Sequence, residues 1–270
     1  AESVADVVIA CIEVPREEAS AFGVVDVDEN DRIVRFIEKP NDPPGMPDKP
    51  DRSFVSMGIY AFRTEFLFDL LREDAEKEDS GHDFGHDLIP YIVRHGHARV
   101  HRFSRSCVKS TATADDYWRD VGTIDTYFEA NLDLTSVLPQ FDLYDEDWPI
   151  WTSMEMLPPA KFVHDVDGRR GFATGSLVSP GCIVSGATVR NSLLANRVRV
   201  KSYAQLDRVV ALPGTVIGQH ARLRNVILDA ELAIPAGLVV GEDPAADAAR
   251  FNRTDKGVCL ITREMLERLQ

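Results

Sequence analysis

A repeat in the second half of the chain constrains the fold more than any other feature. Small or apolar residues recur at steps of six, as in Ile183 and Val189 or Ala233 and Val239. A longer period of 18 residues defines three series: Val198, Val216 and Ile234; Ser202, His220 and Leu238; and Asp207, Asn225 and Asp243. Such a pattern is typical of a triangular coil of three short strands, which buries its inner face only by stacking on further coils. We therefore predict a parallel β-helix over residues 172–250, with the first series as one inward column. The alternative is an irregular β-sandwich with accidental spacing.

The part of the chain before the repeat has a different pattern. Val4–Val14 is rich in Val and Ile and predicts a buried strand, and the segment from Phe22 to Pro40 predicts a β-hairpin with a polar turn. Further strands are expected over 55–62 and in ARVHRFS, with helices over 64–71, after SGHDFG and after Thr123. Strands that alternate with helices predict an α/β layer architecture. We expect a first domain over 1–145, a linker over 146–171, and a C-terminal strand and helix within 251–270.

Composition excludes several classes of function. The formal net charge of −14 over 270 residues argues against a nucleic-acid surface, although a local basic pocket could still hold a small anion. We expect no membrane span, because no apolar run approaches the length of about 18 residues that a span needs. The first residues lack the basic region of a signal peptide, and the four cysteines show no metal-ligand spacing. These features predict a cytoplasmic protein.

The hairpin ends in FIEKP, which places a carboxylate beside an ammonium just before a proline. Glu38 could accept hydrogen bonds from sugar hydroxyls, and Lys39 could bind a phosphate. The competing interpretation is a solvated ion pair at a strand end, because charge pairs are common on protein surfaces. Both interpretations remain open from these two residues alone.

A series of motifs along the whole chain identifies a family resemblance. In order they are FGV, FIEKP, SMGIYAF, HDFGHDLIP, YWRDVGT, LPPAKF, the hexapeptide repeats and an ITREML tail. Together they resemble the glucose-1-phosphate adenylyltransferases (ADP-glucose pyrophosphorylases) of bacterial glycogen synthesis. The resemblance implies a Rossmann-like nucleotidyltransferase domain followed by a left-handed parallel β-helix. It also implies an enzyme that uses Mg²⁺ to transfer an adenylyl group from ATP to α-D-glucose 1-phosphate, giving ADP-glucose and pyrophosphate.

The resemblance also points to a missing element. Members of the family open with a glycine-rich loop that holds the nucleoside triphosphate, and no such loop or P-loop occurs in this sequence. The chain resembles the C-terminal two-thirds of the enzyme, so we expect it to be inactive alone and assign it no catalytic residue.

Several binding residues follow from the resemblance, each with a structural alternative. Gly23 and Ser56 would contact the glucose, together with Glu38 and Lys39; the alternatives are a turn glycine and a locally bonded strand serine. Asp120 would bind the metal, or it could be a helix N-terminal acid.

The resemblance further implies regulation and assembly. Arg263 matches a position in a site for phosphorylated metabolite effectors, although Glu267 stands where some members have arginine. A homotetramer is expected as well, partly because open coil ends need partners. Two alternatives from other classes remain: a non-catalytic regulatory subunit of the same fold, and a β-helix acyltransferase that uses His220.

Overall fold

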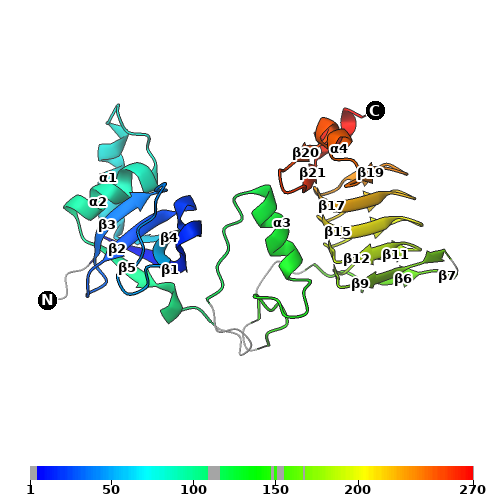
Figure 1. Ribbon diagram of the computed structural model, residues 1–270, viewed down its shortest axis with the longest axis horizontal. Coiled ribbons are helices and arrows are strands. Elements are labelled where there is room, and N and C mark those ends of the chain that lie inside the picture. The colour runs from blue at the N-terminus through cyan, green and yellow to red at the C-terminus, as the bar shows by residue number, and fades with distance from the viewer. Residues whose placement is uncertain (1–4, 109–115, 147–148, 151–154, 167, 270) are drawn as a thin grey trace. The chain divides into compact units, whose positions relative to one another are not determined.

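The computed structural model describes residues 5–108, 116–146, 149–150, 155–166 and 168–269 (Figure 1). These residues form two compact units. Unit 1 comprises Ala1–Lys109 and Ala114–Asp116, and unit 2 comprises Ser110–Thr113 and Tyr117–Gln270. Among the described helices, none is long and apolar enough to cross a membrane.

Unit 1 is built on a five-stranded sheet in the order β3-β2-β4-β1-β5. The predicted hairpin is confirmed: β2 and β3 pair antiparallel, with Gly23 opposite Glu38 at its open end. β1 pairs antiparallel with β4 and parallel with β5. The strands are β1 (Val7–Pro15), β2 (Gly23–Val27), β3 (Ile33–Glu38), β4 (Arg52–Phe62) and β5 (Ala98–Arg102).

The helices of unit 1 cover this sheet with apolar side chains. Ile89 and Ile92 of α2 are fully buried, in one cluster with Ile9 of β1, Ile33 of β3 and Leu70 of α1. Because this cluster joins strands and helices, unit 1 has the predicted α/β layers. The helical elements are η1 (Arg16–Ala21), α1 (Thr64–Ala75), η2 (Phe84–Leu88), α2 (Ile89–His95) and η3 (Phe103–Arg105).

Unit 2 contains the predicted parallel β-helix. Short strands stack in parallel, coil upon coil, as the arrows in Figure 1 show. One face has the order β18-β16-β14-β11-β6, and a nine-stranded sheet forms the others because β15 and β17 continue around a corner. The first face comprises β6 (Lys161–Val163), β11 (Ile183–Ser185), β14 (Arg199–Val200), β16 (Val216–Ile217) and β18 (Ala233–Ile234). The larger sheet comprises β9 (Phe172–Thr174), β10 (Leu177–Val178), β12 (Thr188–Arg190), β13 (Leu193–Leu194), β15 (Gln205–Ala211), β17 (Arg222–Leu228), β19 (Val239–Val240), β20 (Asn252–Arg253) and β21 (Cys259–Ile261), and a separate hairpin pairs β7 (Asp165–Val166) with β8 (Arg169–Arg170).

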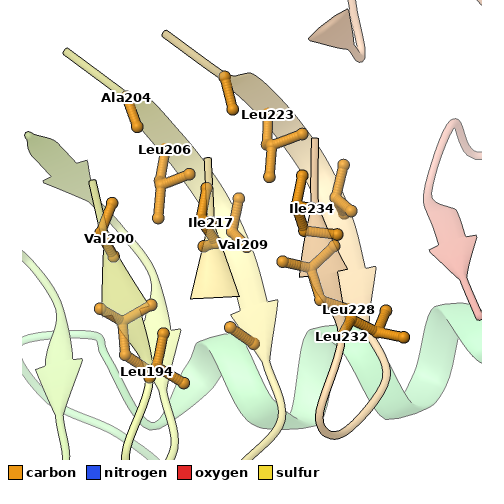
Figure 2. Packing of buried hydrophobic residues seen from close by; sticks show 14 of the residues in the cluster. Leu194, Val200, Ala204, Leu206, Val209, Ile217, Leu223, Leu228, Leu232 and Ile234 are labelled. Carbon is orange, nitrogen blue, oxygen red and sulfur yellow. The ribbon is translucent and has the colours of Figure 1, made fainter. Parts of the chain in front are cut away.

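The repeat length of the coil differs from the predicted 18 residues. Strand register places Val200, Ile217 and Ile234 side by side, so these coils are 17 residues apart. The predicted inward column is therefore wrong at Val216, which pairs with Arg199 and Ala233 and is only half-buried. Figure 2 shows Val200, Ile217 and Ile234 pointing into the interior instead.

The corners of the coil explain this period. Each corner has one residue with positive φ, and from Gly186 to Gly237 these residues are spaced by five, six and six positions in turn. This conformation costs a residue with a side chain about 1–2 kcal/mol, and stacking on the neighbouring coil stabilises it. The ring of Tyr203, for example, stacks on that of His220 at 4.7 Å. The corner residues of this part are Gly186, Asn191, Arg197, Tyr203, Arg208, Gly214, His220, Asn225, Glu231 and Gly237.

Helix α3 (Ile124–Asp133) packs on the outside of this coil. Thr123 caps it in a capping box with Thr126, as the sequence predicted for the helix start. Phe128 and Leu132 form a buried cluster with Val210, Ile227 and Val258. This contact places α3 in unit 2, so the compact units divide well before residue 145.

The C-terminal end of the coil has additional elements. Asp243 does not continue the predicted coil series: its side chain accepts hydrogen bonds from the amides of Ala245 and Ala246 and caps α4 (Pro244–Arg250). The strand and helix predicted within 251–270 are confirmed as β21 and α5 (Arg263–Glu267).

Candidate functional site

The hairpin end of unit 1 brings Gly23, Glu38 and Lys39 together. Gly23 pairs with Glu38 across β2 and β3, and the amide of Lys39 donates a hydrogen bond to the carbonyl of Phe22 at 3.0 Å. The backbone of Lys39 is left-handed, with φ of 44°. Its Nζ lies 3.7 Å from Oε1 of Glu38; the lysine side chain is 67% exposed and the glutamate side chain 24%. The pair therefore has an exposed cation beside a carboxylate that is mostly covered by the protein.

Two glycines flank the Glu38 carboxylate. A Cβ at Gly23 would lie 2.9 Å from Oε2 of Glu38 and 2.3 Å from the ring of Phe36. A Cβ at Gly85, in η2, would lie 2.7 Å from the same oxygen and 2.8 Å from Cδ. The carboxylate of Glu38 thus lies between the backbones of Gly23 and Gly85, and we call this space the slot. In this structure the space that Gly23 leaves free is filled by a ring and a carboxylate, and its contact with a sugar stays a prediction.

Ser56 is connected to this slot through Tyr60. Ser56 is buried in β4, and its Oγ accepts a hydrogen bond from the amide of Gly58 at 3.2 Å. Burial raises the pKa of the Tyr60 phenol; a hydrogen bond with Ser56 opposes that rise, and the charge of Glu38 adds to it. The Tyr60 ring also stacks on Phe84, with centroids 6.1 Å apart.

This arrangement is suited to a ligand with hydroxyls and a phosphate. The Glu38 carboxylate can only accept hydrogen bonds, whereas the Lys39 ammonium donates them and carries the compensating charge. Tyr60 and Phe84 add an aromatic surface beside the acceptor. Aromatic rings often cover the apolar side of a ligand while polar groups orient it.

Asp120 and Arg263 belong to unit 2. Asp120 is exposed, and its Oδ1 accepts a hydrogen bond from the amide of Gly122 at 3.2 Å, so the carboxylate could still reach a cation. Within the described ranges there is no group of three or more His, Cys, Asp or Glu residues that could hold a metal ion. A divalent cation that takes phosphate oxygens and water needs only one or two carboxylates from the protein, so the metal role of Asp120 stays a prediction. Arg263 is exposed at the start of α5 and donates from Nη2 to the carbonyl of Glu231 at 3.3 Å.

Sequence reasoning missed three residues beside the slot. Tyr60 could have been found, because it lies four residues after Ser56 and the period of two in a strand places both on one face. Phe84 and Gly85 stand in the quoted HDFG motif, but nothing in that motif reveals that they meet Glu38 and Tyr60.

Comparison with known proteins assigns both parts of the chain to families. Residues 1–137 match the model of the nucleotidyl transferase family, and residues 158–261 match the GlmU-like, C-terminal hexapeptide family. The chain belongs to the nucleotidyl transferase family. The match covers the slot and both of its glycines, so the geometry above lies inside the nucleotidyl transferase part.

Curated relatives of this nucleotidyl transferase have one name in common. The chain is 59% identical over 268 residues to a glucose-1-phosphate adenylyltransferase of Rhodopseudomonas palustris (strain TIE-1), which covers 99% of the chain and 64% of the relative. Proteins of the same name from Granulibacter bethesdensis and Rhizobium meliloti (strain 1021) are 60% and 58% identical, with the same coverage. The nucleotidyl transferase chain thus spans somewhat less than two-thirds of the length of these relatives.

Proposed function

We propose that this chain carries the sugar-phosphate site of an enzyme that makes ADP-glucose from ATP and α-D-glucose 1-phosphate. A phosphate oxygen of the sugar attacks the α-phosphorus of ATP, and pyrophosphate leaves with the electron pair of the broken P–O bond. The observation that carries the proposal is the Glu38–Lys39 pair in its glycine slot, inside a nucleotidyl transferase domain. The name of the relatives supports the choice of substrates.

Each residue of the slot has a distinct part in this proposal. Lys39 neutralises the phosphate of glucose 1-phosphate, because its ammonium is exposed and lies at the mouth of the slot. Glu38 accepts hydrogen bonds from sugar hydroxyls. Ser56 and the backbone at Gly23 complete the sugar site, with Ser56 reaching it through Tyr60. Transfer of this kind depends on positioning and charge neutralisation more than on covalent chemistry.

The remaining expectations extend the same proposal. Asp120 would supply one ligand to a divalent cation, Mg²⁺, which neutralises phosphate charge when bound. Arg263 would contact a phosphorylated effector, and the coil of unit 2 would take part in a homotetramer. We propose a cytoplasmic enzyme of glycogen synthesis. Its motifs divide the chain into parts over 1–145, 172–250 and 251–270 with a linker over 146–171, and the α3 segment of the first part packs on the coil within unit 2.

Substitution of Lys39 tests the proposal directly. Lys39→Gln keeps much of the side chain's length and removes its charge. A hydrogen bond to a charged group contributes about 1.5–3 kcal/mol, so binding of glucose 1-phosphate should weaken by roughly 10- to 150-fold. Isothermal titration calorimetry on the purified chain measures this change.

A matched control separates the site from general charge effects. Lys49 is also exposed and also pairs with a carboxylate, Oε2 of Glu13 at 2.8 Å, but it lies in the loop before β4 and its partner is on β1. Lys49→Gln should leave the affinity within about twofold of wild type. Equal losses in the two variants, or no saturable binding by the wild-type chain, would remove the basis for the proposed site.

A further inference from the structure

Gly85 makes the closest approach to the Glu38 carboxylate from outside the hairpin. A Cβ at this position would lie 2.7 Å from Oε2, 2.8 Å from Cδ and 3.2 Å from Oε1 of Glu38. Gly85 is not among the residues with positive φ, so its backbone conformation is open to any L-residue. The reason for glycine here is therefore space for the carboxylate and not the shape of the chain.

The segment that carries Gly85 is fixed from the end of α1. Asp74 is buried, and its two oxygens accept hydrogen bonds from Ser80 Oγ and from the His82 ring, each at 2.8 Å. The amide of His82 donates to Ser80 Oγ at 3.1 Å, which closes a small network. His82 has φ of 55°, and the network compensates for that left-handed turn. We call Asp74, Ser80 and His82 the Asp74 clasp.

Two further contacts fix the chain between His82 and Gly85. Asp83 caps η2, since its Oδ1 accepts a hydrogen bond from the amide of His86 at 2.8 Å. Phe84 packs on Tyr60 and on Phe62, with centroids 6.1 Å and 5.9 Å apart. The backbone of Gly85 is thus held in place by contacts on both sides, and it limits the positions that the Glu38 carboxylate can take.

We propose that Gly85 is a positioning residue that fixes the Glu38 carboxylate for the sugar, and that the Asp74 clasp fixes Gly85. The inference deepens the proposed function and rests on it for the identity of the ligand. Ordinary van der Waals contact begins near 3.4 Å, so a methyl group at residue 85 would displace the carboxylate by about 0.7 Å. Misplacement of a binding group by about 1 Å can cost as much as 100-fold.

The effect should appear in binding and not in folding. The atoms that a Cβ at Gly85 would meet are the far end of one flexible side chain, which can move away. Alanine is also the better helix former, by about 1 kcal/mol. Gly85→Ala should therefore fold normally and bind glucose 1-phosphate about tenfold more weakly. Gly23 differs, because a Cβ there would meet the Phe36 ring at 2.3 Å and disturb the core.

The experiment compares Gly85→Ala with a matched control in the same segment. A Cβ at Gly81 would lie 3.1 Å from Oδ2 of Asp87, and Glu38 is not among its neighbours. Gly81→Ala should keep the affinity for glucose 1-phosphate within about twofold of wild type. Both variants are also made with Glu38→Asp, whose carboxylate is shorter by one methylene and falls short of Gly85. In that background Gly85→Ala should cost no more than about twofold.

A second measurement does not depend on the ligand. The ¹³C resonance of the Glu38 carboxylate, assigned by its loss in Glu38→Gln, should shift in Gly85→Ala and stay in place in Gly81→Ala. An unchanged resonance, or a loss of affinity that persists with Glu38→Asp, would overturn the positioning role. If the wild-type chain does not bind glucose 1-phosphate, the proposed function fails, and the resonance alone still decides whether Gly85 fixes Glu38.

Discussion

The 17-residue period makes a sharp prediction at two neighbouring residues of the coil. Ile217 is fully buried between Val200 and Ile234, whereas Val216 is half-buried on the same short strand. Truncation of a buried isoleucine to alanine costs about 2–5 kcal/mol, and a site stacked between two coils has little freedom to collapse. Ile217→Ala should therefore destabilise unit 2 by about 3–4 kcal/mol, near the middle of that range. Val216→Ala should cost about 1 kcal/mol or less, since it gives up less buried apolar area.

Urea unfolding followed by tryptophan fluorescence measures this difference. The three tryptophans of the chain stand at positions 118, 148 and 151, and Trp118 belongs to the described part of unit 2, so its emission reports this unit. With an m-value of about 2 kcal/mol per molar urea, a loss of 3 kcal/mol lowers the midpoint by about 1.5 M. Val216→Ala is the internal control, because an 18-residue period would make it the inward residue. Equal shifts, or a larger shift at Val216, would refute the register and the reasoning from it.

Two further predictions follow from titratable groups. Hydrogen bonds from His82 and then Ser80 hold the pKa of Asp74 below its usual value. The stability that Asp74 contributes is therefore present above the unfolded pKa of about 4 and is lost as pH falls through the lower folded pKa. The melting temperature of Asp74→Asn, measured by circular dichroism, should fall less steeply between pH 5 and pH 3 than that of the wild type, and parallel curves would count against the clasp. Burial raises the pKa of the Cys259 thiol to about 11. Ellman's reagent at pH 8 should therefore modify the half-exposed Cys107 in the native chain, and Cys259 only after unfolding. Rapid modification of Cys259 in the native chain would contradict its burial.

The coil shows how far the sequence could lead. Steps of six between small or apolar residues predicted stacked short strands, and that prediction is confirmed. The sequence could not reveal that one side of each coil has five residues, because residues such as Tyr203 and His220 show no intrinsic preference for the left-handed corner. Stacking with the neighbouring coil sets that conformation, and it is a tertiary effect.

Long-range packing accounts for the other differences. The sequence predicted a helix after Thr123 correctly, but its packing partners Val210 and Ile227 are far along the chain, and no local pattern identifies them. The same holds for the slot. Motifs singled out Glu38 and Lys39, whereas the approach of Gly85 depends on how α1 and η2 return to the hairpin.

The backbone of Lys39 explains why two opposite charges stand side by side at the hairpin end. Successive side chains of a strand point to opposite faces, so an extended FIEKP would separate Glu38 from Lys39. The left-handed φ of 44° at Lys39 breaks this alternation, and Nζ lies 3.7 Å from Oε1 of Glu38. That conformation costs about 1–2 kcal/mol, whereas an exposed ion pair contributes about 0–1 kcal/mol. The hydrogen bond from the Lys39 amide to Phe22 offsets part of the cost, but the ion pair alone does not account for the turn. The turn places a cation and an acceptor on one side of the chain, which is the arrangement that the proposed binding of a phosphorylated sugar requires.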